Sequence, residues 1–546
     1  MSKKLIKTEY APIYLGAFLR LIYFIINLFI GGRNIDEAML SLNAASLSNS
    51  GTDISGIKMP VYFDTWVHGG QSPLPTYLSA ITVKAFGFNL FGIRLPALLI
   101  SIAGLVFFCF LIKELKFKDT ESFAIQWLAC ICPWGLFSSV YVLDCNYFGH
   151  FCIIALFILA KATNTGRLRY YALSMVFFAL SMYCYLASVL IIPILLSVFY
   201  LTLILKKKIN ISQILTSVIV IFIIALPFIA FGLINTGVIK PFELFGFTFQ
   251  KMEGYVRYRE TIFRNDLSET LLNAVRSFTL TFFIDFCMVD ITALFNGENI
   301  FLYGNALGGI FLLCGILVFA KALLKKSYKN RFSFTQKVFA LSVFAGTISF
   351  ITLVENNNYS DIVYRYGVLS YFLIPFEGIG LYTLAKRLKN TDIKKVIAVY
   401  LIVSLAVFNF EFFGKYAIQT KEINNVTYGD SLYKCFKQLD ECPAESVTVY
   451  QRDNTYFTRI SVFCRCYYYD RYDFINIREE IAETLEDKNK AVSCTDNGKI
   501  LFETDNGNLE KYKYLIISDD DHSVIDSKNY TIYDCGYFNL YEKSDK

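Results

Sequence analysis

Charged residues are scarce in this sequence. Of its 546 residues, 18% are Asp, Glu, Lys or Arg, 55% are hydrophobic, and the mean hydropathy is +0.44. A water-soluble domain cannot hide that much apolar surface inside itself. The composition therefore excludes an ordinary soluble globular protein and predicts a multi-pass protein of the cell membrane, whose main partner is the lipid bilayer.

Histidine is nearly absent as well. The three histidines, His68, His150 and His522, belong to no spaced Cys/His cluster, which argues against a dedicated zinc site. A divalent Mg or Mn ion stays open as a cofactor, because carboxylate oxygens such as those of Asp36 and Asp144 are sufficient ligands for it.

The sequence also lacks an internal repeat and a basic patch suited to nucleic acid. Its net charge is +6, but the basic residues stand in short clusters between apolar runs, as topology determinants do. Placing all the clusters in the cytoplasm gives about eleven helices, a cytoplasmic N-terminus and an extracytoplasmic C-terminus. The clusters are Lys3–Lys7, Lys113–Lys118, Lys161–Arg169, Lys206–Lys208, Lys321–Arg331 and Lys386–Lys395.

The apolar runs end near Phe413, which divides the chain into a predicted membrane domain, 1–413, and a polar tail, 414–546. The first run, Ala11 to Gly31, has no cleavage site and predicts a retained signal anchor. The 170–205 stretch fits two short spans joined by a tight turn near Ala187 and Ser188.

The tail alternates short β-branched runs with helical patterns, which predicts a small extracytoplasmic α/β domain. The strands are expected at 446–450, 514–518 and 530–541, and the helices at 431–439 and 477–485. Its six cysteines lie in a predicted oxidising space, but their pairing does not follow from the sequence.

Acidic side chains meet the first predicted span at its outer end. Ile35, Ala38, Met39, Leu42 and Ala45 recur at helical spacing and predict an amphipathic helix on the membrane surface. A second such stretch runs from Pro73 to Phe88, with Lys84 off its apolar face. Asp36 and Glu37 open the first helix, where Asn34 and Glu37 could also form a capping box.

The first outer loop resembles that of glycosyltransferase family 39, which includes the protein O-mannosyltransferases and is similar to the aminoarabinose transferases. The resemblance rests on Asp36-Glu37-Ala38, Trp66 to Leu74, Tyr77, Phe86-Gly87-Phe88 and Arg94-Leu95-Pro96. It implies the GT-C fold, a helical membrane bundle with interfacial helices and a catalytic acid in this loop. Aminoarabinose transferases carry a Lys and a Glu near residues 71–73, and this chain has neither.

The resemblance implies a transfer of sugar from a polyprenyl-phosphate donor to a hydroxyl acceptor on a glycan, lipid or protein, with inversion. Asp36 matches the catalytic acid and is the predicted base, with Glu37 as a further candidate. Asp144, after Leu143, resembles a second acid of the family, although capping of the next helix explains it equally. The candidates for substrate binding are Arg94, Arg365, Lys84, His68 and Tyr77, and Arg94 could instead anchor its span.

A flippase or transporter of lipid-linked saccharides is the alternative from another class. Ionisable residues in the middle of spans would favour it. The predicted spans are nearly free of charge and the acids gather toward one face, so the sequence favours the enzyme.

Overall fold

The structure is a computed structural model that describes residues 10–30, 35–54, 56–63, 70–252, 305, 308–353, 359–388, 392–411, 430–439, 446–450, 492–494, 498–503 and 506–544. The chain forms two compact units. One contains Met1–Ile26, Pro96–Thr236 and Glu253–Tyr416; the other contains Asn27–Leu95, Gly237–Met252 and Ala417–Lys546. The predicted domain boundary at 413/414 falls outside the described residues and stays a prediction.

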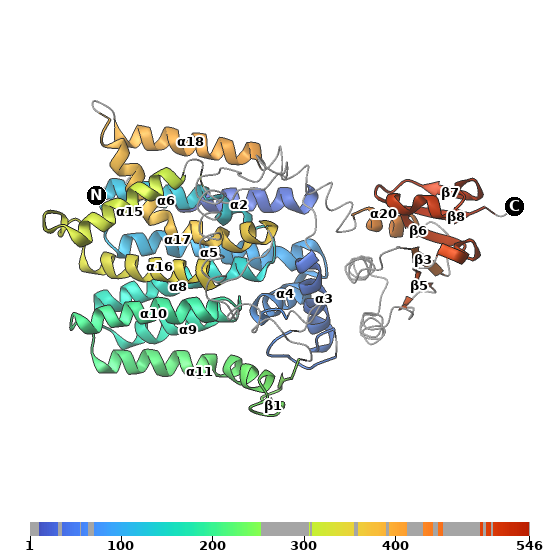
Figure 1. The fold of residues 1–546 in the computed structure, drawn as a ribbon, viewed down its shortest axis with the longest axis horizontal. Coiled ribbons are helices and arrows are strands. Elements are labelled where there is room, and N and C mark those ends of the chain that lie inside the picture. Colours follow the sequence, from blue (N-terminus) through green and yellow to red (C-terminus); the bar gives the residue numbers. More distant parts are fainter. Residues whose placement is uncertain are drawn as a thin grey trace, which may run out of the picture. The chain divides into compact units, whose positions relative to one another are not determined.

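The first unit is a bundle of helices (Figure 1). Its elements, two of which extend into the other unit's segments, are α2 (Ala11–Ile30), α5 (Leu90–Glu114), α6 (Asp119–Ile131), α7 (Pro133–Phe137), α8 (Asp144–Thr165), α9 (Leu168–Met182), α10 (Ser188–Leu205), α11 (Ile211–Asn235), α15 (Gly308–Leu324), α16 (Phe334–Leu353), α17 (Tyr359–Ala385) and α18 (Ile393–Glu411). Among the described residues, five helices are long and apolar enough to cross a membrane, namely α2, α5, α8, α11 and α18, and five shorter apolar helices accompany them. The chain is therefore a multi-pass membrane protein, and the count of about eleven spans stays a prediction.

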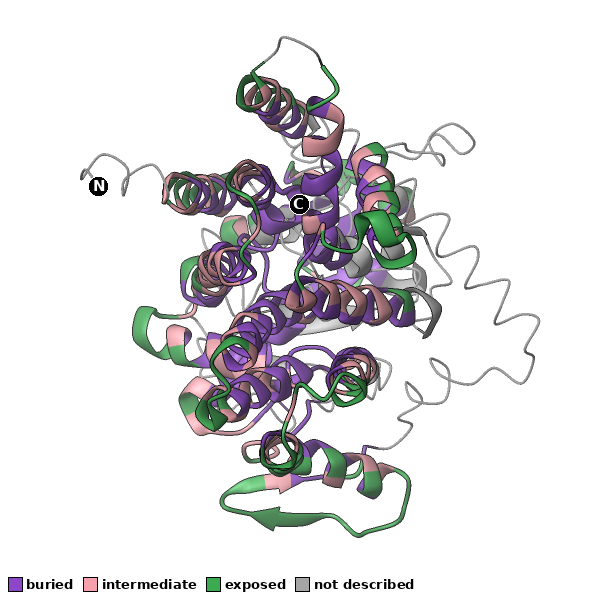
Figure 2. Cartoon of the chain, turned by 90° about the vertical axis from the view of Figure 1, so that its left-hand side faces the viewer, coloured by how far each residue is buried: buried purple, intermediate pink, exposed green. Residues whose placement is uncertain are grey.

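Apolar side chains cover the flank of the bundle as well as its core. Ile219, Phe222 and Ile223 of α11 are more than half exposed, whereas α8 is buried along most of its length. Figure 2 shows buried residues gathered toward the inside of the bundle and exposed ones on the outer helices. An apolar flank of this kind is stable only against hydrocarbon.

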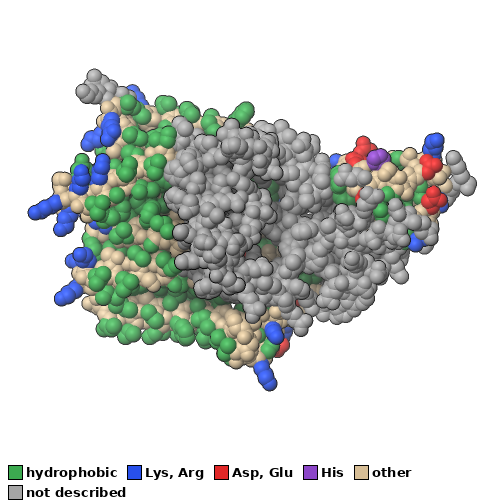
Figure 3. Space-filling model, viewed as in Figure 1, with side chains coloured by type: hydrophobic (Ala, Val, Ile, Leu, Met, Phe, Trp, Pro, Cys, Tyr) green, Lys and Arg blue, Asp and Glu red, His purple; other side chains and the backbone are tan. Residues whose placement is uncertain are grey.

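The described residues of the bundle's basic clusters lie together at one end (Figure 3). Figure 3 shows its Lys and Arg side chains gathered there, where the connections α5–α6, α8–α9, α10–α11 and α15–α16 also lie in Figure 1. This arrangement is what the positive-inside rule requires if all these clusters share one side of the membrane. The predicted turn near Ala187 is confirmed, because α9 ends at Met182 and α10 begins at Ser188.

The second unit includes the predicted interfacial helices, α3 (Ile35–Ser50) and α4 (Pro73–Phe86), which pack against each other. A short antiparallel hairpin, β1 (Phe242–Leu244) and β2 (Phe247–Phe249), belongs to the same unit. Residue Thr248 of β2 pairs with Pro60, so the hairpin is tied to the loop that follows α3.

The tail contains a six-stranded mixed sheet, which confirms the predicted α/β class. Its order is β4-β5-β3-β6-β8-β7, with bounds Val492–Cys494, Gly498–Glu503, Ser446–Tyr450, Tyr514–Ser518, Phe538–Lys543 and Tyr530–Tyr533. Strands β5, β3 and β6 are parallel and the outer pairs antiparallel. Helix α20 (Asp430–Leu439) packs on the sheet through Cys435, whose thiol donates to the carbonyl of Phe538. The helix expected at 477–485 lies outside the described residues.

Two glycines allow α15 and α17 to touch through their backbones. A Cβ added to Gly315 would collide with the carbonyl of Phe376, and one added to Gly380 would collide with the carbonyl of Phe311. Small residues drive helix association in membranes because they permit this close approach.

We therefore expect Gly380→Leu to prevent the bundle from assembling, since the α15–α17 contact has no room for a side chain. The measurement is the folded, monodisperse yield in detergent by size-exclusion chromatography. Gly232→Leu is the control, because nothing lies within 4 Å of a Cβ at Gly232 of α11. Equal yields of the two variants would contradict the role given to the glycine contact.

Candidate active site

A buried ion pair joins α3 to α5. Nε of Arg94 donates to Oε1 of Glu37 at 2.9 Å, and Nη2 donates to Oε2 at 2.6 Å. The Arg94 side chain is 0% exposed and that of Glu37 2%. Nη1 of Arg94 also donates to Oδ1 of Asn27 at 2.6 Å and to its carbonyl at 3.3 Å. One guanidinium thus holds the end of α2, the first turn of α3 and the start of α5 together.

This geometry determines what Glu37 and Arg94 can do. Both oxygens of Glu37 accept hydrogen bonds in the fork-like arrangement that makes Arg–carboxylate pairs strong. Arg94 is inside the protein, so it does not snorkel to water, and its charge is balanced by Glu37. The pair is therefore suited to fix the turn that carries Asp36, and Arg94 has its Nε and both Nη atoms occupied.

Three predicted site residues cannot be placed by their side chains. Asp36 is the second residue of α3 and Arg365 lies within α17, but the side chains of both, and all of His68, fall outside the described part of the chain. Their assignments stay predictions.

Helix α3 differs from its prediction. Every residue from Met39 to Leu47 is buried, so the expectation that the apolar face of this stretch meets lipid was wrong, and its place at the membrane surface stays a prediction. Its polar residues bind the loop that follows: Asn43 accepts from the backbone N–H of Ile54 at 3.1 Å, and Ser46 donates to the carbonyl of Asp53 at 2.9 Å. The periodicity of α3 could not show this cover, because the loop comes after the helix in the sequence.

Helix α4 does keep an exposed apolar face. Ile81 is 66% and Phe86 53% exposed, whereas Ser79, Ala80 and Val83 are buried. This matches the predicted interfacial helix, whose apolar face needs lipid. Lys84 is exposed in the last turn, where its charge suits the negative end of the helix dipole.

Tyr77 of α4 binds protein groups. Its hydroxyl donates to the carbonyl of Pro60 at 2.8 Å, and its ring packs against Phe63 and Phe247 at centroid distances of 5.5 and 6.5 Å. Burial, with Asp53 nearby, raises the pKa of Tyr77, so the phenol stays neutral. Tyr77 thereby fastens α4 to the loop and to the hairpin.

Two hydroxyls at the beginning of α4 were not singled out from the sequence. Ser72, the N-cap, and Thr76, one turn later, are fully buried, and neither hydroxyl oxygen has a hydrogen-bond partner among the described residues. Buried polar groups are rarely left unpaired. The signal was available in the motif Gln71-Ser72-Pro73, because its Ser and the Thr four residues later share one side of the helix.

Asp144 is the first residue of α8, in the bundle. It is partly exposed, and its Oδ1 accepts from the backbone N–H of Cys145 at 2.8 Å. The carboxylate also lies at the positive end of the dipole of α8, a helix that is buried along most of its length. Asp144 thus stabilises the first turn of α8, whose N-cap residue is Leu143, and the active-site assignment stays a prediction.

Among the described residues of the bundle, Arg20 and Glu377 are exceptions to the expected lack of charge, and His150 and Glu121 are buried there as well. Arg20 of α2 donates to Ser101 at 2.9 Å and to the carbonyls of Gly16 and Cys130 at 3.0 and 3.3 Å. Glu377 of α17 accepts from Asn305 at 3.0 Å and from the hydroxyl of Tyr400 at 3.4 Å. Both are buried, and neutral groups supply these contacts.

The part of the chain that the structure describes contains no group of three His, Cys, Asp or Glu residues that could hold a metal ion. The carboxylate of Asp36 is not in that part. A Mg or Mn ion on Asp36 and Asp144 therefore stays a prediction.

Residues 70–231 match the family model of the dolichyl-phosphate-mannose-protein mannosyltransferases. This segment runs from the start of α4 through most of α11, so the resemblance predicted from the first loop is confirmed over it. A comparison with curated proteins gave no match.

The fold matches solved membrane enzymes. ArnT from Cupriavidus metallidurans in the apo state superposes with a TM-score of 0.55 and 11% identity, covering 97% of both chains, and ArnT bound to undecaprenyl phosphate gives 0.55 and 10%, covering 98% of this chain and 99% of that one. The apo Archaeoglobus fulgidus oligosaccharyltransferase gives 0.50 and 14%, covering 98% and 74%. The predicted GT-C fold is thereby confirmed.

The buried pair gives a double-mutant test. We expect Arg94→Met or Glu37→Gln alone to destabilise the protein by about 3–5 kcal/mol, because each leaves a buried partner unpaired. The double variant should lose less than the sum of the two, as measured by thermal unfolding of purified protein in detergent. Additive losses would show that the two side chains do not depend on each other.

Proposed function

We propose that this chain is a membrane glycosyltransferase that moves a sugar from a polyprenyl-phosphate carrier to a hydroxyl acceptor at the outer face of the membrane. The observation that carries the proposal is the acidic first turn of α3, fixed by the Glu37–Arg94 pair at the end of the first apolar helix in a GT-C bundle. The mannosyltransferase match over residues 70–231 and the likeness to an enzyme that binds undecaprenyl phosphate support the choice of donor.

In the proposed reaction Asp36 accepts the proton of the acceptor hydroxyl as its oxygen attacks the anomeric carbon. The bond from that carbon to the phosphate oxygen breaks, and the polyprenyl phosphate leaves with the electron pair. A single displacement of this kind inverts the anomeric configuration. One base and a few groups that offset phosphate charge are sufficient, because the phosphate is already a good leaving group.

The remaining candidate residues fall into two groups, those that position the site and those assigned to bind substrates. Glu37 and Arg94 act as positioning residues, since each occupies the other, and Tyr77 holds α4. Arg365, Lys84 and His68 are assigned to the donor phosphate and the sugar, and Asp144 to orientation of the acceptor. The buried hydroxyls of Ser72 and Thr76 lie at the N-terminus of α4, where Pro73 and Pro75 have no N–H to donate, and we assign no ligand to them.

The membrane orientation is part of the proposal. With the basic end of the bundle in the cytoplasm, the N-terminus is cytoplasmic, and the first loop and the tail are extracytoplasmic. The tail then has access to the acceptor, and acceptor recognition is the function that we assign to it.

A flippase for lipid-linked saccharides is the second candidate. The buried Arg20 and Glu377 favour it, because ionisable groups inside a membrane bundle often belong to a transport path. Both are bonded within the bundle, however, whereas the family match and the acidic loop point to transfer.

We expect Asp36→Asn to abolish sugar transfer, because the amide cannot accept the proton; loss of a general base costs about 10²- to 10⁴-fold in rate. The measurement is transfer of radiolabelled sugar from a panel of polyprenyl-phosphate sugars, at equal protein abundance in membranes. Asp392→Asn, an exposed acid at the basic end, is the matched control. Undiminished transfer by Asp36→Asn would remove Asp36 from the mechanism, and no transfer by the wild type from any donor would favour the flippase.

The orientation can be tested separately with reporters fused after Lys546. Alkaline phosphatase should be active there and green fluorescent protein should not fluoresce, since the first needs an oxidising compartment and the second the cytoplasm. Fusions after Lys208 should behave in the opposite way. Cytoplasmic signals from the C-terminal fusion would overturn the proposed orientation.

A further inference from the structure

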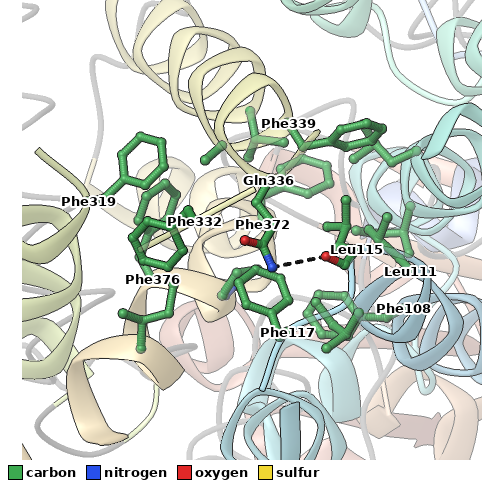
Figure 4. Close-up of a pocket in the computed structure, with 17 residues that line it drawn as sticks. Phe108, Leu111, Leu115, Phe117, Phe319, Phe332, Gln336, Phe339, Phe372 and Phe376 are labelled. Carbon is green, nitrogen blue, oxygen red and sulfur yellow. Dashed lines mark hydrogen bonds between the residues drawn. The ribbon is translucent and has the colours of Figure 1, made fainter. Parts of the chain in front are cut away.

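An apolar cavity opens among α5, α8, α15, α16 and α17 of the bundle (Figure 4). It encloses about 610 Å³ of empty space, its opening included. Seven of the 17 residues that line it are phenylalanines, among them Phe108, Phe319, Phe339 and Phe372. Such a lining suits hydrocarbon and offers nothing to a sugar.

The one polar side chain in the lining is already satisfied. Gln336 donates from Nε2 to the carbonyl of Leu115 at 2.9 Å, the bond drawn in Figure 4, and its Oε1 accepts from the backbone N–H of Ser333 at 2.8 Å. Water in the cavity would therefore find almost no partners, and dry apolar cavities bind apolar molecules.

A second pocket adjoins the cavity, and we call the two together the track. This second pocket, about 300 Å³ with its opening included, shares Leu156, Val343 and Phe372 with the first and reaches Phe350. From Gln336 to Phe350 the track follows α16 for about 21 Å, at about 1.5 Å per residue. A single extended alkyl chain fits a space of that shape better than a compact ligand does.

The wide end of the track lies at the basic end of the bundle. Leu115 and Phe117 line it. Their neighbours in the sequence, Lys116 and Lys118, are both exposed. Arg331 is engaged otherwise, because it pairs with Glu121 and lies over the ring of Phe332 at 4.8 Å. The two lysines are thus placed to attract an anionic headgroup next to an apolar cavity.

We propose that this cavity binds one acyl chain of an anionic phospholipid from the leaflet at the basic end, with its headgroup phosphate beside Lys116 and Lys118. The cavity lies apart from Asp144: Leu156, which lines both pockets, is twelve residues, or about 18 Å, along α8 from Asp144. The lipid is a structural ligand that fills the space between five helices.

The test uses the full chain reconstituted in vesicles of phosphatidylglycerol or phosphatidylcholine that carry a photoreactive diazirine near the end of one acyl chain. Peptides of α16 and α17 should be labelled more strongly than those of α11, whose exposed apolar face reports contact with bulk lipid. Labelling should be stronger from phosphatidylglycerol. Equal labelling of α11 and α16, or equal labelling from both lipids, would overturn the proposal.

Two variants sharpen the result. Ala340→Phe places a ring in the cavity and should abolish the excess labelling while the protein stays folded; Ile348→Phe, on the bilayer-facing side of α16, is its control. Changing Lys116 and Lys118 to Gln should reduce the preference for phosphatidylglycerol about 25-fold, since each lysine near an anionic surface contributes about fivefold. The same change at Lys206 and Lys208 should have no such effect.

Lipid that co-purifies with the wild type gives an independent measurement, which does not depend on the folding of any variant. Mass spectrometry should find an anionic phospholipid retained through detergent exchange. Polyprenyl phosphate in its place would overturn the proposal and would assign the track to the donor carrier. Loss of transfer in Asp36→Asn leaves the lipid result unchanged, so the two proposals fail separately.

Discussion

The Glu37–Arg94 pair is the interaction on which the candidate site depends. In a low-dielectric setting two opposite charges are stable only when each has its partner and its hydrogen bonds. Here the guanidinium fork meets both carboxylate oxygens and its remaining Nη atom bonds Asn27. The ion pair therefore holds together the two ends of the segment from Glu37 to Arg94. Asp36 is next to Glu37 in the first turn of α3. The α3–α4 contact and the Tyr77 hydrogen bond to Pro60 lie within the segment that the pair closes.

Much of the fold could be predicted because it follows from local patterns. The first helix follows an apolar run of the sequence, and strands β3 and β6 follow β-branched runs. The turn between α9 and α10 lies where one apolar run ends. Periodicity did not predict the burial of α3, because two of its polar residues, Asn43 and Ser46, bind residues 53–54 and not water. The predicted strand at 530–541 is two strands, β7 and β8, joined by a turn that contains Gly536 at φ +107°.

The site was harder to predict than the fold. The family resemblance singled out Asp36 and Glu37 as catalytic candidates and Arg94 as a substrate-binding one, but the partner of Glu37 lies 57 residues away and no pattern shows such a pair. The capping box proposed for Glu37 competed with that pair, and a buried Arg–carboxylate fork is the stronger interaction. The sequence did not predict the buried hydroxyls of Ser72 and Thr76, because uncharged side chains do not stand out from an apolar run. Arg20 and Glu377 are isolated in their runs, and only tertiary structure gives them partners.

The backbone contact between α15 and α17 limits how this bundle can move. With Phe376 and Phe311 carbonyls pressed against the two glycines, neither helix can rotate about its own axis or slide along the other without a collision. Helices α15 and α17 are therefore expected to move together as one rigid body. Any opening or closing of the bundle has to displace them together or be confined to the other helices.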